Sequence, residues 1–255
     1  MASVGKDGRR AGIFAAMAAA MIGTALVMAS STVFNNFFDR GMDAKMARTR
    51  TRASVTGKIP PTVMILYGTC LGACGFITLA SLNVLTAVLG LLAFLLYAVV
   101  YTLWFKRQSV WSTFVGSFPG AAPPLIGYCA LTGYIDMPAI LLYAIMFLWQ
   151  PPHFWAIGIR RKEEYRAAGI PLLPIIKGNR VTKIKMLRFI AVLTAVSLLV
   201  PLYIDVSPFY TATALLLGPS GCTGASKAFR RRMTRNGRRG CFFIRLFISV
   251  CFFLF

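Results

Sequence analysis

Three oxygen-bearing side chains recur at intervals of four residues in the segment FNNFFDRGMDAKMARTRTR. If this segment is helical, Asn35, Asp39 and Asp43 lie along one face, because residues four apart sit one turn above another. Carboxylate and amide oxygens are hard ligands that suit Mg²⁺, which in proteins binds through one or two carboxylates together with substrate phosphates. The spacing therefore predicts a metal and phosphate site; the alternative is that both aspartates only pair with bases at a helix end. Basic side chains able to meet phosphate oxygens follow directly, at Lys45, Arg48, Arg50 and Arg52.

A second pair of acidic residues lies in the segment WQPPHFWAIGIRRKEEYRAAGIPLLP, at Glu163 and Glu164. Two acidic clusters, each beside basic residues, suit a diphosphate held by bridging metal ions. Taken alone, however, this second pair is better explained by surface pairing with Arg160 and Arg166. The two clusters form one site only if the fold brings both segments to the same end of the molecule.

The elements that must position these residues are transmembrane helices. Of 255 residues, 57% are apolar and 14% are charged, whereas a soluble domain is nearer half apolar and a quarter charged. Apolar runs of about twenty residues recur, which is the length that spans a bilayer as a helix. We therefore predict an all-α, polytopic transmembrane bundle of about seven or eight helices, and exclude a soluble enzyme, a disordered basic chain and a disulfide scaffold. The runs are 13–38, 61–82, 84–105, 110–131, 137–159 and 184–204, with shorter ones at 209–217 and 241–255.

The net charge of +21 sits in short clusters between the apolar runs. This pattern is typical of the cytoplasmic loops of a membrane protein, so no nucleic-acid partner is expected. Basic segments at 40–58, 106–109 and 160–183 alternate with segments that carry at most one charge. The positive-inside rule places the basic segments on the cytoplasmic side, and four of the seven acidic residues then share that face.

The two ends of the chain fit this topology poorly. Three basic residues precede the first run, and a single span would place them opposite the basic 40–58 segment; a missing preceding helix would remove this conflict. We assign residues 1–217 to the transmembrane domain. Residues 218–255 differ in composition and form an atypical basic tail with a short apolar segment. A frameshifted tail and a basic loop followed by a short last helix both explain this composition.

Five motifs follow one another between the first acidic segment and the second. In this order and at this spacing they resemble the protohaem IX farnesyltransferases (haem O synthases) of the UbiA-type intramembrane prenyltransferase superfamily. The resemblance covers about residues 14–217, and the first motif alone would indicate only the superfamily. The matching residues are Asn35, Asp39, Asp43, Met46, Arg48 and Thr49; Tyr101, Thr102, Lys106 and Arg107; Gly120 to Tyr128; Trp149, Gln150, Pro152 and His153; and Glu164 to Pro174.

The resemblance implies a nine-helix bundle with a central cavity, whose first helix precedes the Asn/Asp motif and has no counterpart here. It also implies transfer of a farnesyl group from farnesyl diphosphate to a vinyl group of haem B, which gives haem O. In such a reaction Mg²⁺ and basic groups stabilise the departing diphosphate. An allylic carbocation is left in an apolar cavity, the vinyl group attacks it, and water supplies a hydroxyl.

The resemblance also implies roles for individual residues. Asn35, Asp39 and Asp43 are expected to bind the metal ion and the diphosphate, with both aspartates essential for catalysis. Glu164 is expected as the second metal-side carboxylate, with Glu163 as a further candidate. The family usually has Asp at the position of Glu164, so the metal geometry there is expected to differ. The diphosphate-binding candidates are Arg48, Arg52, Lys106 and Arg107.

His153, the only histidine, lies within the fifth apolar run. An ionisable side chain inside a membrane span is a functional candidate by default, whereas a lone histidine in a bundle is often a hydrogen-bonded core residue. With the resemblance, three catalytic roles stay open for His153: haem contact, axial ligation and proton handling.

The resemblance further implies the lipid bilayer, farnesyl diphosphate and haem B as partners, together with haem A synthase or terminal oxidase assembly. No arginine- and serine-rich leader is evident, which favours a bacterial cell membrane over a mitochondrial inner membrane. Three alternatives remain: another UbiA-type prenyltransferase acting on a quinone or chlorin precursor, an inactive truncated copy, and a small transporter. Coupling carboxylates of transporters usually lie near the membrane midplane, whereas here the acids crowd one face beside bases.

Overall fold

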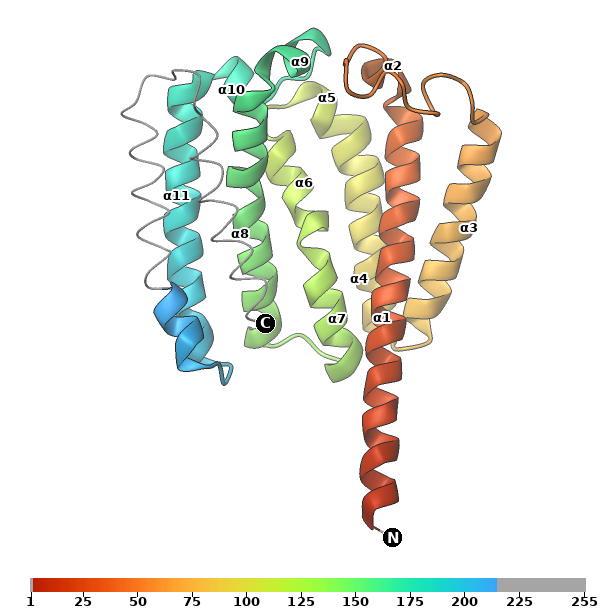
Figure 1. The fold of residues 1–255 in the computed structure, drawn as a ribbon, viewed down its shortest axis with the longest axis vertical. Helices are drawn as coiled ribbons and strands as arrows, with labels where there is room; N and C mark the ends of the chain where they lie inside the picture. Colours follow the sequence, from red (N-terminus) through yellow and green to blue (C-terminus); the bar gives the residue numbers. More distant parts are fainter. Residues whose placement is uncertain (1, 215–255) are drawn as a thin grey trace.

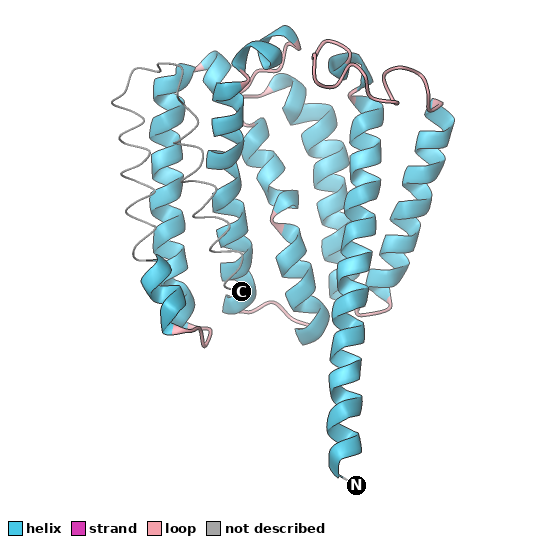
Figure 2. Ribbon diagram, viewed as in Figure 1, coloured by secondary structure: helices cyan, strands magenta, loops and turns pink. Residues whose placement is uncertain are grey.

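The computed structural model describes residues 2–214, with side chains from residue 10 onward. All regular secondary structure in these residues is helical (Figures 1 and 2). Six of these helices are long and apolar enough to cross a membrane, which confirms the predicted all-α membrane bundle. Residues 208–214 are also helical, whereas the predicted tail at 218–255 lies outside the described residues. The spans are α1 (Ala2–Phe38), α3 (Pro61–Ala80), α4 (Val84–Leu95) continued by η1 (Leu96–Phe105) and α5 (Lys106–Gln108), α6 (Ser112–Gly120) with α7 (Ala122–Thr132), α8 (Met137–Arg160), and α11 (Gly178–Leu199) with η2 (Val200–Leu202).

Local sequence signals mark the ends of several spans. The side chain of Asn83 accepts a hydrogen bond from the Thr86 backbone N–H, 2.9 Å away, and so caps the start of α4. Asp136 caps α8 in the same way through the Ala139 N–H. Gly133 ends α7 in the left-handed region, with φ of 77°, which glycine adopts without a steric penalty. The predicted breaks between apolar runs are therefore real turns.

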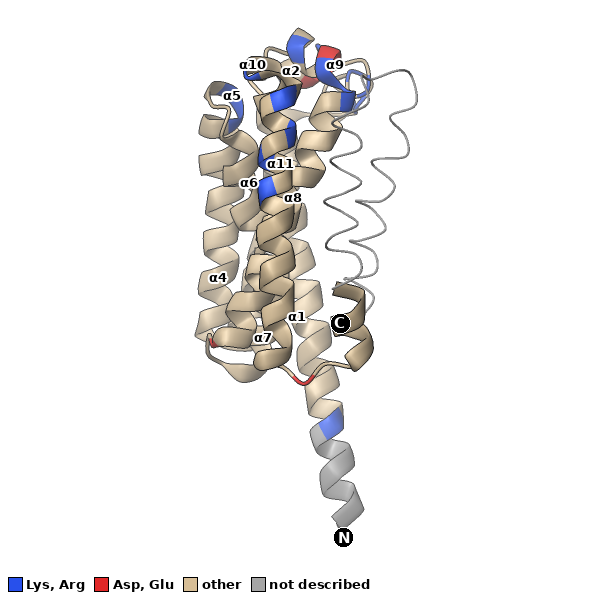
Figure 3. Ribbon diagram, turned by 90° about the vertical axis from the view of Figure 1, so that its left-hand side faces the viewer, with Lys and Arg blue, Asp and Glu red and all other residues tan. Residues whose placement is uncertain are grey.

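The charged turns lie together at one end of the bundle, as the alternation of basic and bare segments predicts. Lysine and arginine residues are gathered around three short helices, α2 (Arg40–Asp43), α9 (Lys162–Ala167) and α10 (Leu173–Ile176) (Figure 3). The first and second acidic segments belong to α2 and α9, so both lie at this end, whereas the bare turns lie at the other. We refer to the end that carries α2, α9 and α10 as the basic end.

α1 and α3 pack closely against each other, because glycines let their backbones approach. A methyl group added to Gly75 would lie 2.9 Å from the Val27 backbone nitrogen and 3.0 Å from the Gly23 carbonyl oxygen. One turn away, Ser30 donates a hydrogen bond to the Gly68 carbonyl oxygen at 2.6 Å. Small residues of this kind are typical of helix contacts within membranes. The pair fixes the position of α1, which carries the first acidic motif.

The N-terminal part of α1 projects beyond the other helices at the end opposite the basic end (Figure 1). Residues 10–15 are all exposed, and the first buried residue of α1 is Ala20. This placement puts Arg10 across the span from the basic 40–58 segment, which is the conflict with the positive-inside rule that the sequence predicts for a single span.

One helix start differs from the sequence-based expectation. α11 begins at Gly178, six residues before the predicted run at 184, because its first turns carry basic side chains that hide the helix from a search for apolar residues.

The two proline pairs differ from each other in their place in the helices. Pro123 and Pro124 lie in the first turn of α7, where the missing N–H groups would have no helical partner in any case. The interruption between α6 and α7 lies just before them. The pair at 151–152 lies buried inside α8, which continues to Arg160.

Candidate functional site

The predicted Asn/Asp face lies where α1 meets α2. Asp39 separates the two helices, yet its N–H bonds to the Asn35 carbonyl oxygen at 2.9 Å, and the Asp43 N–H bonds to the Asp39 carbonyl oxygen at 2.8 Å. These helix-type hydrogen bonds keep the spacing of one turn across the junction. All three side chains are buried, and Asp39 is only 2% exposed. The predicted spacing of one helical turn between these three residues is confirmed.

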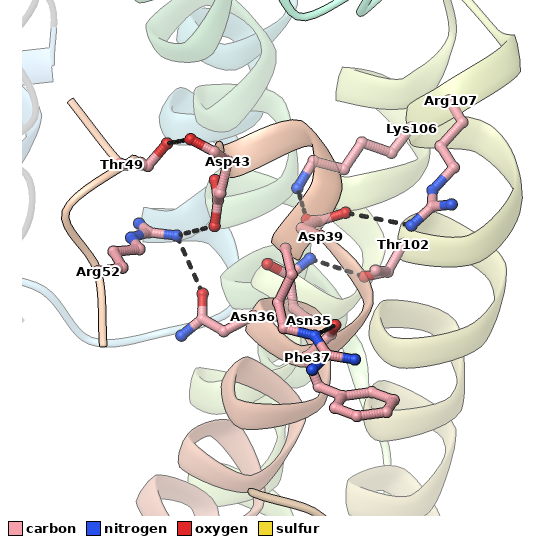
Figure 4. A network of polar contacts seen from close by, with 11 residues as sticks. Asn35, Asn36, Phe37, Asp39, Asp43, Thr49, Arg52, Thr102, Lys106 and Arg107 are labelled. Atoms are coloured by element: carbon pink, nitrogen blue, oxygen red, sulfur yellow. Dashed lines mark hydrogen bonds and ion pairs between the residues drawn. The ribbon is translucent and has the colours of Figure 1, made fainter. Parts of the chain in front are cut away.

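Asp39 is held between two basic residues of α5. Lys106 Nζ contacts one carboxylate oxygen, Oδ2, and Arg107 Nη2 lies 3.7 Å from the other, Oδ1 (Figure 4). Arg107 also donates a hydrogen bond to the Phe38 carbonyl oxygen at 2.7 Å, which satisfies an acceptor at the end of α1. Oδ1 of Asp39 is buried and accepts no hydrogen bond from the described part of the chain. This oxygen therefore has a charged neighbour but no hydrogen bond in the described chain.

Asp43 pairs with a base from the segment that follows α2. Arg52 Nη1 lies 2.7 Å from Asp43 Oδ2 and donates a second hydrogen bond to Asn36 Oδ1 at 3.1 Å. The hydroxyl of Thr49 donates to the Asp43 carbonyl oxygen at 2.9 Å. Through these contacts the irregular segment from Ala44 is tied back onto α1 and α2.

Thr102 connects the same site to η1, which is a π-helix of ten residues. The amide nitrogen of Asn35 donates a hydrogen bond to Thr102 Oγ1 at 2.9 Å, and the Thr102 hydroxyl donates in turn to the Tyr97 carbonyl oxygen at 2.7 Å. Wide π-helical turns are rare and often occur at functional sites. Thr102 belongs to one of the matched motifs, but its sequence context does not reveal the π-helix or its contact with Asn35.

The second acidic segment adjoins the first through an apolar contact. Met46, which follows α2, is buried against Ala168 and Ile170, which follow α9. Glu163 is 77% exposed and forms a surface ion pair with Arg166 at 2.6 Å, as the pairing alternative predicts. Glu164 is less exposed, at 36%; its Oε2 lies 3.7 Å from Arg161 and accepts no hydrogen bond within the described chain.

The structure does not gather all the predicted metal ligands into one group. Within the described residues, no three carboxylate, histidine or cysteine side chains lie close enough together to hold one metal ion. Glu163 and Glu164 are therefore separate from the two aspartates, although both pairs lie at the basic end. Arg48 is exposed and forms no ion pair in this part of the chain. Of the four diphosphate candidates, Arg52, Lys106 and Arg107 contact the aspartates.

His153 is a partly buried residue of α8. Its ring centroid lies 5.0 Å from that of Trp149, and 5.6 Å from that of Phe154. Gln150, almost one turn before His153, packs at the break between α6 and α7: its amide nitrogen donates to the Met146 carbonyl oxygen at 3.1 Å, and its side chain abuts Gly120. Of the W-Q-x-P-H motif, Gln150 is thus the residue that contacts this break.

The oxygens around Asp39 fit a hard divalent cation. Asp39 Oδ1 is a buried acceptor without a hydrogen bond in the described chain, and the side chains of Asn35 and Asp43, one turn before and after it, are also buried. Carboxylate and amide oxygens of this kind are the ligands that Mg²⁺ takes. The site also has one positive charge in excess, which favours an anionic ligand. The charged groups counted are the bases Arg52, Lys106 and Arg107 and the carboxylates Asp39 and Asp43.

Comparisons with known proteins agree with this arrangement. The model of the UbiA prenyltransferase family matches residues 8–249. The chain is 83% identical over 249 residues to Protoheme IX farnesyltransferase 1 of Bacillus velezensis, covering 98% of this chain and 79% of that protein. It is 66% identical over 217 residues to the protein of the same name from Bacillus subtilis, covering 84% of this chain and 68% of that one.

Solved structures share the fold at low sequence identity. A digeranylgeranylglyceryl phosphate synthase structure aligns with a TM-score of 0.77 at 15% identity, over 96% of this chain and 93% of that one. A UbiA homolog from Archaeoglobus fulgidus, solved with DMAPP and Mg²⁺, aligns with a TM-score of 0.68 at 18% identity, over 94% and 87%. From its helical fold, its acidic motif and these matches, the chain belongs to the UbiA prenyltransferase family.

Proposed function

We propose that this chain transfers a farnesyl group from farnesyl diphosphate to a vinyl group of haem B, which makes haem O within the membrane. The observation that carries the proposal is 83% identity, across 98% of the chain, to a protein named Protoheme IX farnesyltransferase 1. The site supports it independently, because buried acids and bases converge at one end of a membrane bundle. A transporter would not need this pairing of aspartates with several bases.

In this proposal, the described residues bind the diphosphate and hold it in place. Lys106 and Arg107 carry positive charge next to Asp39, and Arg52 does so next to Asp43. These bases stabilise the negative charge that grows on the diphosphate as the bond to the farnesyl carbon breaks. Each base is already held by a carboxylate, so little side-chain entropy is lost when the ligand binds.

Asn35, Asp39 and Asp43 would hold Mg²⁺, which when bound neutralises charge on the leaving diphosphate. The relative from Archaeoglobus fulgidus was solved with Mg²⁺ and a prenyl diphosphate, which supports the same use here. Glu164 would act as a further carboxylate on the diphosphate side, because its shielded Oε2 lacks a hydrogen bond within the described chain. Glu163 is a weaker candidate for this role, since it is exposed and pairs with Arg166.

Substrate and cellular context complete the proposal. His153, beside Trp149 on α8, is assigned to the haem side of the reaction. The chain is a multi-pass membrane protein, with six candidate spans within residues 10–214. We assign it to a bacterial cell membrane, since the named relatives are bacterial, with haem A synthase or terminal oxidase assembly as downstream partners.

The test is expression of the chain in bacterial cells that lack their own haem O synthase, followed by chromatography and mass spectrometry of the extracted haems. We expect haem O from the wild-type chain and none from Asp43→Asn, with equal amounts of both proteins in the membrane. In isolated membranes, EDTA should stop the reaction and Mg²⁺ should restore it. A prenylated quinone precursor in place of haem O would assign the chain to another prenyltransferase, and turnover in EDTA would exclude the metal site.

A further inference from the structure

We infer that Thr102 is a positioning residue, which fixes the orientation of the Asn35 amide through the π-helical turn of η1. The inference rests on the proposed metal and diphosphate site, and concerns how that site is kept in a binding-competent state. Thr102 itself contacts neither ligand; it acts through Asn35.

The hydrogen-bond chain runs in one direction only. Thr102 is fully buried, and its single hydroxyl hydrogen points at the Tyr97 carbonyl oxygen, 2.7 Å away. A threonine hydroxyl has one donor, so its oxygen can only accept from any other neighbour. The group of Asn35 that faces Thr102 must therefore be the NH₂, and Asn35 Nδ2 lies 2.9 Å from Thr102 Oγ1.

The π-helix decides which carbonyl the hydroxyl reaches. In a regular helix a buried threonine donates to the carbonyl four residues earlier, as Thr182 does to Gly178 in α11, at 2.8 Å. Thr102 instead donates to Tyr97, five residues earlier, within the wide turns of η1. Because the hydroxyl hydrogen is used in the bond to the Tyr97 carbonyl oxygen, Thr102 Oγ1 can only accept a hydrogen bond from α1.

This contact also fixes the direction of the Asn35 amide oxygen. With Nδ2 directed at Thr102, the amide oxygen points away from it (Figure 4). An amide oxygen is a ligand for a cation, whereas an amide NH₂ repels one. A flipped amide would present its two N–H donors where the amide oxygen now lies. Thr102 prevents this flip.

The experiment compares three variants of the full chain in detergent, with Mn²⁺ and inorganic pyrophosphate as probes and electron paramagnetic resonance as the readout. Thr102→Val removes the hydroxyl at nearly constant volume, and Thr102→Ser restores it. Thr182→Val is the matched control, because Thr182 is equally buried and its hydroxyl also donates to a backbone carbonyl. We expect Thr102→Val to weaken Mn²⁺ binding roughly tenfold, the size expected when a buried polar group loses its partner. Thr102→Ser and Thr182→Val should bind as the wild type does.

A double-mutant cycle separates orientation from packing. In Asn35→Asp the side chain offers an oxygen whichever way it turns, so orientation no longer matters. Adding Thr102→Val to Asn35→Asp should then change Mn²⁺ affinity by less than about twofold. A full tenfold loss in that background, or Mn²⁺ binding by Thr102→Val that equals the wild type, would overturn the inference while leaving the proposed function intact. Failure of the wild type to bind Mn²⁺ with pyrophosphate would overturn both.

Discussion

Lys106 and Asp39, which are 67 residues apart in the sequence, form a buried ion pair where the end of α1 meets α5. Asp39 is almost completely enclosed, and the side chain of Lys106 is 20% exposed. An enclosed carboxylate is tolerated only when opposite charge and hydrogen bonds compensate for the lost water. The pair therefore links the stability of the basic end to the same charges that would bind a diphosphate.

Replacement of Lys106 by methionine tests this link. Lys106→Met leaves Asp39 with only the more distant Arg107, so we expect a loss of about 3 kcal/mol of stability together with the loss of haem O formation. The double variant Lys106→Met with Asp39→Asn removes both charges and should regain most of the stability but none of the activity. Thermal unfolding in detergent and haem O assays provide the two readouts. A single variant that melts at the wild-type temperature and turns over normally would contradict the role of this pair.

The two neighbouring glutamates of α9 should differ in importance. Glu164→Gln changes a shielded carboxylate whose Oε2 lacks a hydrogen bond, and we expect at least a tenfold loss of activity, by analogy with other charge-stabilising groups. Glu163→Gln is the matched control: it changes an exposed side chain whose surface ion pair contributes little, so activity and stability should stay within error. Equal effects of the two substitutions would remove Glu164 from the site.

Much of the fold follows from local sequence signals. Helical spans require only a continuous apolar length, and their turns are marked by Asn83, Gly133 and Asp136. Five of the six spans in the described residues were therefore predictable to within three residues at each end, and the start of α11 to within six. Alternating charge likewise predicts that both acidic segments lie at one end. These features depend on neighbours in the sequence, which is why a single sequence contains them.

The features that could not be predicted from the sequence depend on contacts between distant segments. Nothing in the sequence around Thr102 distinguishes ten π-helical residues from an ordinary apolar helix, and the contact with Asn35 spans 67 positions. The difference between Glu163 and Glu164 is also tertiary, since one points to the surface and the other is shielded. Sequence reasoning therefore placed these residues at one end of the bundle but did not show how they are paired.

His153 should affect the haem substrate more than the diphosphate. We expect His153→Ala to weaken haem B binding or alter the haem spectrum, and to lower activity, because the residue lies on α8 beside Trp149. Binding of farnesyl diphosphate should change less than twofold, since the bases that form ion pairs with Asp39 and Asp43 come from α5 and from the segment after α2. Titration of the purified variant with haem B, followed by absorbance, gives the measurement. Unchanged haem affinity and spectrum with full activity would make His153 a packing residue.

The close contact of α1 and α3 gives the last prediction. At Gly75 an added methyl group would lie within 3.0 Å of backbone atoms of α1, which cannot rotate away as a side chain can. Gly75→Ala must therefore push the two helices apart, and we expect a loss of about 2 kcal/mol of stability, typical of overpacking. Because α1 carries Asn35 near its end and Asp39 follows it directly, haem O formation should fall as well. Gly127→Ala is the control: no atom lies within 4 Å of the added methyl group in α7, and alanine favours helix, so thermal stability should be unchanged or raised. A Gly75→Ala protein as stable as the Gly127→Ala protein would show that α1 and α3 can separate without cost.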